Sequence, residues 1–279
     1  MASKRYLGID LAWADQAERA ANESGVIAID DMGNVLDAGW TRGIDQTVEW
    51  VDQHADGELA LLFVDAPLVV TNPSGQRLCE RQVGQRYGRW KVSANSTNRF
   101  SPRLAGVALL VALLGKGWSY QTGHEGPPTR GRVVSECYPY TTLVGVPALG
   151  YESDGERPRY KRKPRRMPAA EWRPRRAAAC DELIRRLDKL RSDDPPLHLE
   201  SHPAIRQLIT EPSPLDNQAY KHREDLVDAL LCAWTALLWA RHGHTRCQVL
   251  GPPAESQSPV ATIVAPATPA QRRDGVIHG

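Results

Sequence analysis

The first third of the chain alternates short apolar runs with turns, in a pattern that predicts a β-sheet. Strands are predicted over residues 5–11, 25–30, 34–41 and 59–64. The first and last of these runs are continuously apolar, which indicates strands buried on both faces. The sequence Asp31-Met32-Gly33 is typical of a hairpin turn, so the second and third strands should pair directly. From Ile44 to Val51 apolar residues recur at helical spacing, which predicts a helix that crosses to the fourth strand.

Helices dominate the rest of the chain. They are predicted over residues 104–114, 177–190 and 223–240, with one more strand over 132–137 and a further edge strand over 260–264. Residues 70–103 are rich in Gly, Asn, Ser and Arg and are expected to form a long ordered insertion. We therefore expect a single α/β domain over residues 1–250, with insertions near 70–130 and 150–220. A Pro- and Ser-rich tail over residues 251–279 follows.

Composition narrows the class of protein. The 279 residues are 41% hydrophobic and 24% charged, which suits one large α/β domain. The longest apolar run, residues 107–114, is far shorter than the ~20 residues that a membrane helix needs. Five cysteines form no CxxC pair, so we expect free thiols in a reducing compartment and a cytoplasmic location.

Acidic residues occur at the predicted ends of the strands. Asp10 ends the first strand, Asp65 follows the fourth, and Glu136 lies in the next, while Asp225 and Asp228 stand one turn apart in the last helix. Carboxylates gathered at such positions repel one another unless a cation is shared among them. Oxygen ligands favour Mg²⁺ or Mn²⁺. Two such ions, roughly 4 Å apart, activate a water and stabilise the leaving oxygen of a phosphodiester.

Each of these acids has a structural alternative. Asp10 can simply end a strand, and Asp65, before Ala-Pro, can form a turn. Glu136 inside an apolar strand can pair with an arginine, because an unpaired buried carboxylate is costly. Asp225 lies in the first helical turn, where the helix dipole favours acids. The helix dipole explains Asp228 less well, because Asp228 lies three residues further into the helix.

Basic residues are concentrated between Glu156 and Arg191, where fourteen of the 35 Lys and Arg residues lie against five acids. Within this segment the candidate nucleic-acid-binding residues are Lys161, Arg162, Lys163, Arg165 and Arg166. Such a segment, with Tyr160 and Trp172 interleaved, can follow a phosphate backbone and stack bases. A solvated loop and helix face is the alternative. His222, just before the last acidic pair, can orient a water or simply begin the helix.

The predicted order of elements is typical of the ribonuclease-H-like arrangement: three antiparallel strands, a crossover helix, then parallel strands. The motifs are Gly8-Ile-Asp-Leu-Ala-Trp13, Val64-Asp-Ala-Pro-Leu68, Glu136-Cys-Tyr-Pro139, Tyr160-Lys161 and His222-Arg-Glu-Asp-Leu-Val-Asp-Ala229. Together they resemble domain-of-unknown-function family 429, whose members are predicted ribonuclease-H-like nucleases. The resemblance runs from about Tyr6 to about Trp239.

This resemblance implies a mixed five-stranded sheet of order 3-2-1-4-5, flanked by helices. It implies that Asp10, Asp65 and the Asp225/Asp228 pair gather divalent metal. The last helix is also similar to that of Holliday-junction resolvases. Glu136 belongs to the family's E-x-YP element, for which ribonuclease H proper has no direct counterpart.

We therefore expect a Mg²⁺- or Mn²⁺-dependent nuclease that hydrolyses DNA or RNA by a two-metal mechanism. Asp10 would bridge both ions, Asp65 and Asp225 or Asp228 would complete their ligands, and Glu136 would bind one ion or position water. One alternative is a catalytically silent nucleic-acid-binding scaffold. Another is a phosphotransferase of the actin and sugar-kinase type, although the chain shows neither a duplicated domain nor Gly-rich phosphate loops.

Overall fold

The protein is described by a computed structural model that covers residues 3–12, 23–102, 104–161, 163–253 and 260–272. Its strands are β1 (Lys4–Asp10), β2 (Glu23–Ile29), β3 (Val35–Arg42), β4 (Leu59–Val64), β5 (Ser119–Tyr120), β6 (Gly131–Glu136), β7 (Cys247–Leu250) and β8 (Ile263–Pro266). Its α-helices are α1 (Gly43–His54), α2 (Leu78–Tyr87), α3 (Ala105–Gly115), α4 (Pro139–Gly145), α5 (Tyr151–Asp154), α6 (Ala169–Asp188), α7 (Pro203–Thr210), α8 (Asn217–His242) and α9 (Pro269–Arg272).

The predicted mixed sheet is confirmed, with six strands in the order β3-β2-β1-β4-β6-β5. Strands β1, β2 and β3 are antiparallel neighbours, whereas β4, β6 and β5 continue the sheet in parallel with β1. The prediction of five strands was wrong by one. The extra strand, β5, has two residues, and so short a strand leaves no hydrophobic pattern in the sequence.

The hairpin between β2 and β3 forms as its turn residues predict. The Asp30 Oδ1 atom accepts hydrogen bonds from the N–H groups of Met32 and Asn34, both at 2.9 Å. Gly33 has a φ of +76°, which a residue with a side chain rarely adopts. The turn therefore depends on both the aspartate and the glycine.

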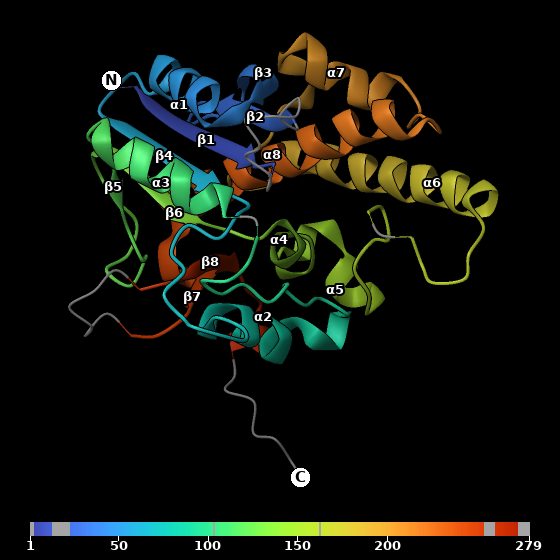
Figure 1. The fold of residues 1–279 in the computed structure, drawn as a ribbon. Coiled ribbons are helices and arrows are strands. Elements are labelled where there is room, and N and C mark those ends of the chain that lie inside the picture. The colour runs from blue at the N-terminus through green and yellow to red at the C-terminus, as the bar shows by residue number, and fades with distance from the viewer. Residues whose placement is uncertain (1–2, 13–22, 103, 162, 254–259, 273–279) are drawn as a thin grey trace.

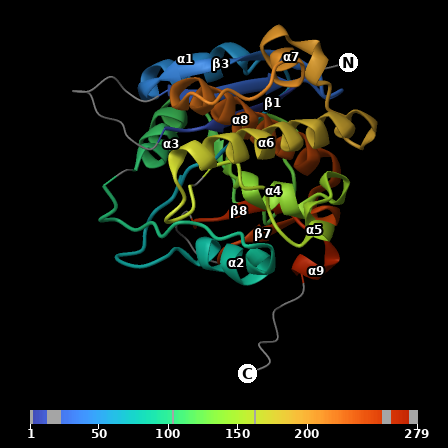
Figure 2. The same ribbon diagram turned by 90° about the vertical axis from the view of Figure 1, so that its right-hand side faces the viewer.

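Helices cover both faces of the sheet (Figure 1). Helices α1 and α3 pack together over one face, while α8 crosses the other face in contact with β1, β2 and β4. Figure 2 shows α6 running beside α8, so the predicted 150–220 insertion extends the layer on the α8 side. The expected insertion after β4 contains α2, a helix that the polar sequence of residues 70–103 did not reveal.

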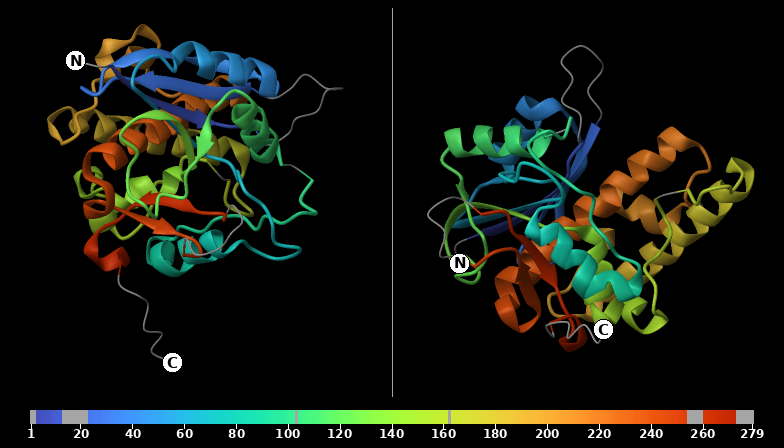
Figure 3. Two further views of the ribbon diagram at one scale, coloured as in Figure 1. Left: turned by 90° about the vertical axis from the view of Figure 1, so that its left-hand side faces the viewer. Right: turned by 60° about the horizontal axis from the view of Figure 1, so that its bottom comes forward.

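The tail strand lies apart from the six-stranded sheet. Strand β8 pairs antiparallel with β7 in a separate two-stranded sheet, which lies beside α2 (Figure 3). One isolated parallel bridge, between Cys137 and Val264, connects β8 to the end of β6. The prediction that residues 260–264 form a strand was thus correct in part, because β8 covers Ile263–Pro266.

Two glycines allow α8 to lie directly on the sheet. A Cβ atom on Gly8 of β1 would lie 2.1 Å from the carbonyl oxygen of Ala229 and 2.3 Å from the Ala233 nitrogen. A Cβ on Gly25 of β2 would lie 2.3 Å from the Asp225 carbonyl oxygen. Since these are backbone atoms of α8, only glycine permits this approach at either position.

The core on both sides of the sheet is apolar. All five cysteines are buried free thiols, as expected from their spacing. Among the helices that the structure describes, none has the length and apolar composition needed to cross a bilayer.

The contact between Gly8 and α8 yields a stability prediction. We expect Gly8→Ala to lower the free energy of unfolding by about 3 kcal/mol, because the new methyl group can be accommodated only if α8 moves away from the sheet. Urea titration followed by circular dichroism measures the change. Gly39→Ala in β3 is the matched control, since its Cβ would meet no atom within 4 Å. Equal stability of the two variants would contradict this account of the packing.

Candidate functional site

Three aspartates converge at one edge of the sheet. In the parallel pairing of β1 and β4, Ile9 stands opposite Val64, so the next residues, Asp10 and Asp65, lie side by side. The Asp65 N–H donates to the Ile9 carbonyl oxygen at 2.8 Å, which extends the pairing to the aspartates. Asp228 reaches the same place from α8. One carboxylate oxygen from each of the three lies within 4.8 Å of the other two.

The backbone register explains why these carboxylates meet. Side chains alternate between the faces of a strand, so Asp10 points to the same face as Gly8, which is the face that α8 covers. Because α8 lies against Gly8 and Gly25, its Asp225 and Asp228 are held over the carboxyl end of β1. The acidic cluster of Asp10, Asp65 and Asp228 is therefore a product of the close packing described above.

Asp228 is fully buried, and both of its oxygens have partners. The Tyr160 hydroxyl donates to Asp228 Oδ1 at 2.6 Å. The Lys161 ammonium contacts Oδ2. Lys161 itself lies near two aromatic rings, with its Nζ atom 5.2 Å from the ring centre of Tyr140 and 5.6 Å from that of Tyr160.

Asp225 lies one helical turn before Asp228 and contacts a different lysine. Its Oδ1 atom pairs with the ammonium of Lys221 on the same helix. Lys221 also lies 3.9 Å from Asp10 Oδ2 and 3.4 Å from Glu224 Oε1. Asp225 therefore borders the acidic cluster without belonging to the three groups that meet within 4.8 Å.

Three of these aspartates, Asp65, Asp225 and Asp228, have raised pKa values. Burial raises the pKa of Asp225 to about 8, and the charge on Asp10 adds to this rise. Burial likewise raises the pKa of Asp228 to about 7, although Lys161 opposes part of the effect. Burial also raises the pKa of Asp65 well above its ordinary value, again against the opposing charge of Lys161. Such shifts are expected where carboxylates are desolvated next to one another, and a bound cation would reverse them.

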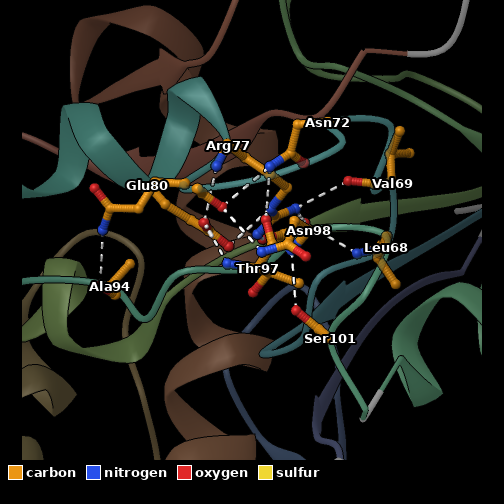
Figure 4. A network of polar contacts seen from close by, with 12 residues as sticks. Leu68, Val69, Asn72, Arg77, Glu80, Ala94, Thr97, Asn98 and Ser101 are labelled. Atoms are coloured by element: carbon orange, nitrogen blue, oxygen red, sulfur yellow. Dashed lines mark hydrogen bonds and ion pairs between the residues drawn. The ribbon is translucent and has the colours of Figure 1, made fainter.

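Glu136 belongs to a separate network with Arg77 and Leu68. Figure 4 labels Arg77, Glu80 and Thr97 of this network. Glu136 stands opposite Val64 in the sheet, so its side chain points to the face opposite that of Asp10. Its two oxygens accept hydrogen bonds from the Arg77 guanidinium at 2.6 and 2.8 Å. The Leu68 N–H donates to the same carboxylate at 3.0 Å. The arginine pairing that the sequence left open is thus the one the structure contains.

Arg77 is itself buried and connects Glu136 to the insertion after β4. Its Nε atom donates to Glu80 Oε1 at 2.8 Å, and its Nη1 atom donates to the Val69 carbonyl oxygen at 3.2 Å. The Thr97 N–H completes the network by donating to Glu80 Oε2 at 3.0 Å. These bonds fix the chain that leaves Asp65, and we assign Glu136 to that positioning task.

The basic segment divides into two parts. Lys161 points into the acidic cluster, whereas Lys163, Arg165 and Arg166 are exposed. Arg162 lies outside the described residues. His222 contacts Glu23, with its Nε2 atom 2.5 Å from Glu23 Oε2.

The contact of Lys161 with Asp228 was not predicted from the sequence. Lys161 was grouped with the basic residues that follow it as a candidate for nucleic-acid binding, and Arg77 was not identified as the partner of Glu136. One signal was present for Lys161: the pair Tyr160-Lys161 stands among the motifs on which the family resemblance rests.

The raised pKa values predict how stability depends on pH. In the unfolded chain, aspartates lose their protons near pH 4, whereas folded Asp225 and Asp228 retain them up to about pH 8 and 7. Between these limits the folded state binds more protons, so its stability falls as pH rises. We expect metal-free protein in EDTA to be less stable to urea at pH 8 than at pH 6. The double variant Asp225→Asn/Asp228→Asn should show a weaker dependence, and a wild type that becomes more stable towards pH 8 relative to this variant would contradict the assignment.

Comparison with known proteins gives one match. The model of a family described as a protein of unknown function, DUF429, matches residues 8–255, which include all five predicted acidic residues. No curated protein and no solved structure matches the chain. The match covers most of the chain, and the protein therefore belongs to the DUF429 family.

Proposed function

We propose that this protein is a divalent-metal-dependent nuclease that hydrolyses phosphodiester bonds of nucleic acid. The observation that carries the proposal is the acidic cluster: three carboxylates, from the ends of two parallel strands and from α8, whose oxygens lie within 4.8 Å of one another. Gathering buried like charges costs free energy in the folded protein. A bound divalent cation would offset that cost, because its positive charge opposes the repulsion among the carboxylates.

The topology supports the same proposal. Strands β3, β2 and β1 are antiparallel, and β4 and β6 follow in parallel, with α1 crossing from β3 to β4. This is the order we expect of a ribonuclease-H-like sheet, extended by the short edge strand β5. Aspartates at the ends of β1 and β4 and on the last long helix match the positions that the family resemblance implies for metal ligands.

The donor set suits Mg²⁺ or Mn²⁺. Carboxylate oxygens are the preferred ligands of these hard cations, and the three cluster carboxylates contribute no nitrogen or sulfur. Such an ion, when bound, lowers the pKa of a coordinated water and stabilises charge on a phosphate. Asp10 and Asp65 would hold the ion, while the Arg77 network keeps the chain after Asp65 in place.

The exposed basic residues provide a second element of the proposal. Lys163, Arg165 and Arg166 follow Lys161 by two to five residues, so the loop that carries them begins at the acidic cluster. Their charges can contact the phosphate backbone of DNA or RNA next to the cluster.

Substitution of Asp10 tests the metal site. We expect Asp10→Asn to abolish Mn²⁺ binding by calorimetry and to lower phosphodiester cleavage at least ~10³-fold, a loss of about 4 kcal/mol in transition-state stabilisation. Asp31→Asn, at the β2–β3 turn on the opposite edge of the sheet, is the control and should behave as wild type. Full cleavage activity in Asp10→Asn would refute the proposed role of this carboxylate. Binding of nucleic acid by wild type without metal-dependent cleavage would favour the scaffold function.

Salt dependence tests the basic loop. Changing Lys163, Arg165 and Arg166 together to Gln should flatten the plot of log binding constant against log salt concentration by about 2–3. The matched control changes Lys116, Arg130 and Arg132 to Gln, because these exposed residues lie near the amino end of β6, away from the acidic cluster. Equal slopes for the two triple variants, measured by fluorescence anisotropy with a labelled oligonucleotide, would show that the loop makes no phosphate contacts.

A further inference from the structure

The side chain of Lys161 is largely buried and lies against the acidic cluster. Its side chain is 17% exposed, and its ammonium contacts Asp228 Oδ2. Its charge also acts on Asp10 and Asp65. Lys221, which pairs with Asp225 and lies 3.9 Å from Asp10, is more exposed, at 57%. Lys161 is therefore part of the cluster.

The backbone that carries Lys161 is fixed from α8. The Tyr220 hydroxyl, on the same helix as Asp228, donates to the carbonyl oxygen of Tyr160 at 2.6 Å. The Tyr160 hydroxyl in turn donates to Asp228 Oδ1 at 2.6 Å. Two hydrogen bonds thus hold residue 160 in relation to α8, and the aromatic rings of Tyr140 and Tyr160 lie near the Lys161 ammonium. Because residue 160 is held in this way, the side chain of the next residue, Lys161, is directed at Asp228.

Charge balance limits what else the cluster holds. When Asp10, Asp65 and Asp228 are ionised they carry three negative charges, and the Lys161 ammonium cancels one of them. Lys221, which lies 3.9 Å from Asp10, pairs with the charge of Asp225. The three cluster carboxylates and Lys161 therefore leave the charge of a single divalent ion. Both Asp228 oxygens are already occupied, one by Tyr160 and one by Lys161. The carboxylates of Asp10 and Asp65 face neither the Tyr160 hydroxyl nor the Lys161 ammonium directly.

We propose that Lys161 takes one of the two cation positions of the acidic cluster, so that the protein binds a single divalent ion, held by Asp10 and Asp65. This inference rests on the proposed metal-dependent nuclease function and replaces the expectation of two metal ions. The ammonium supplies the second positive charge and can donate hydrogen bonds to a phosphate oxygen. Unlike a metal ion, it cannot coordinate a water, so only the position at Asp10 and Asp65 can activate one.

Counting bound ions tests this inference. Mn²⁺ is titrated into metal-free full-length protein, and the free ion is measured by its electron paramagnetic resonance signal. We expect one Mn²⁺ per chain in wild type and two in Lys161→Met, with a spin-coupled signal from the neighbouring pair only in that variant. Lys116→Met, an exposed lysine away from the cluster, is the matched control and should bind one ion. Lys161→Arg keeps the charge and should also bind one.

The outcomes separate this inference from the nuclease proposal. Two ions in wild type, or one in folded Lys161→Met, overturn the role of Lys161 and leave the metal-dependent nuclease standing. No bound ion in wild type removes both proposals at once. Should Lys161→Met fail to fold, the wild-type and Lys161→Arg stoichiometries still decide, because the inference requires one ion in each.

Discussion

The contact of α8 with the bare backbone of β1 determines the rest of this structure. At Gly8 the helix backbone comes so near that a single methyl group would overlap the Ala229 carbonyl oxygen. That distance places Asp228 over the end of β1, where Asp10 and Asp65 already lie side by side. A helix held one side-chain layer further away would separate Asp228 from Asp10 and Asp65. The acidic cluster therefore depends on two residues, Gly8 and Gly25, that carry no functional group.

Buried carboxylates are compensated in two different ways at this edge of the sheet. Glu136 receives two hydrogen bonds from a buried arginine and one from a backbone amide, so both of its oxygens are bonded within the protein. In the Asp10, Asp65 and Asp228 group, the Lys161 ammonium contacts Asp228, and Lys221 lies 3.9 Å from Asp10. The first arrangement stabilises the chain around Arg77. The second brings three carboxylate oxygens within 4.8 Å of one another, which is why we place the metal there and not at Glu136.

Much of this organisation could be predicted from sequence because it depends on local patterns. The apolar run before Asp65 gave the limits of β4 exactly, and the three-residue spacing of Asp225 and Asp228 correctly put them one turn apart on one helix. Which of the two enters the cluster depends on how α8 is rotated against the sheet, and sequence spacing carries no such information. The partner of Glu136 could not be predicted for a related reason: the face of Glu136 is set by register, and Arg77 lies 59 residues earlier in the chain.

The position of Lys161 could not be inferred from the composition of the basic segment. Neighbouring Lys and Arg residues made it one of a charged group, whereas the structure separates it from them by turning one side chain inward. The signal that distinguishes it is the adjacent tyrosine, whose hydroxyl contacts the same aspartate. Charge counts describe a segment, but the role of a residue within it depends on tertiary contacts.

The distribution of the cluster along the chain has a consequence for biosynthesis. Asp10 and Asp65 are translated before Asp228, which follows Asp65 by 163 residues and lies on the helix that presses against Gly8. The first strands can pair before α8 has been synthesised, but the third carboxylate arrives only with α8. A ribosome-bound chain that ends before α8 thus carries the basic loop without a finished cluster. The acidic cluster acquires its full set of charges only once α8 has been made.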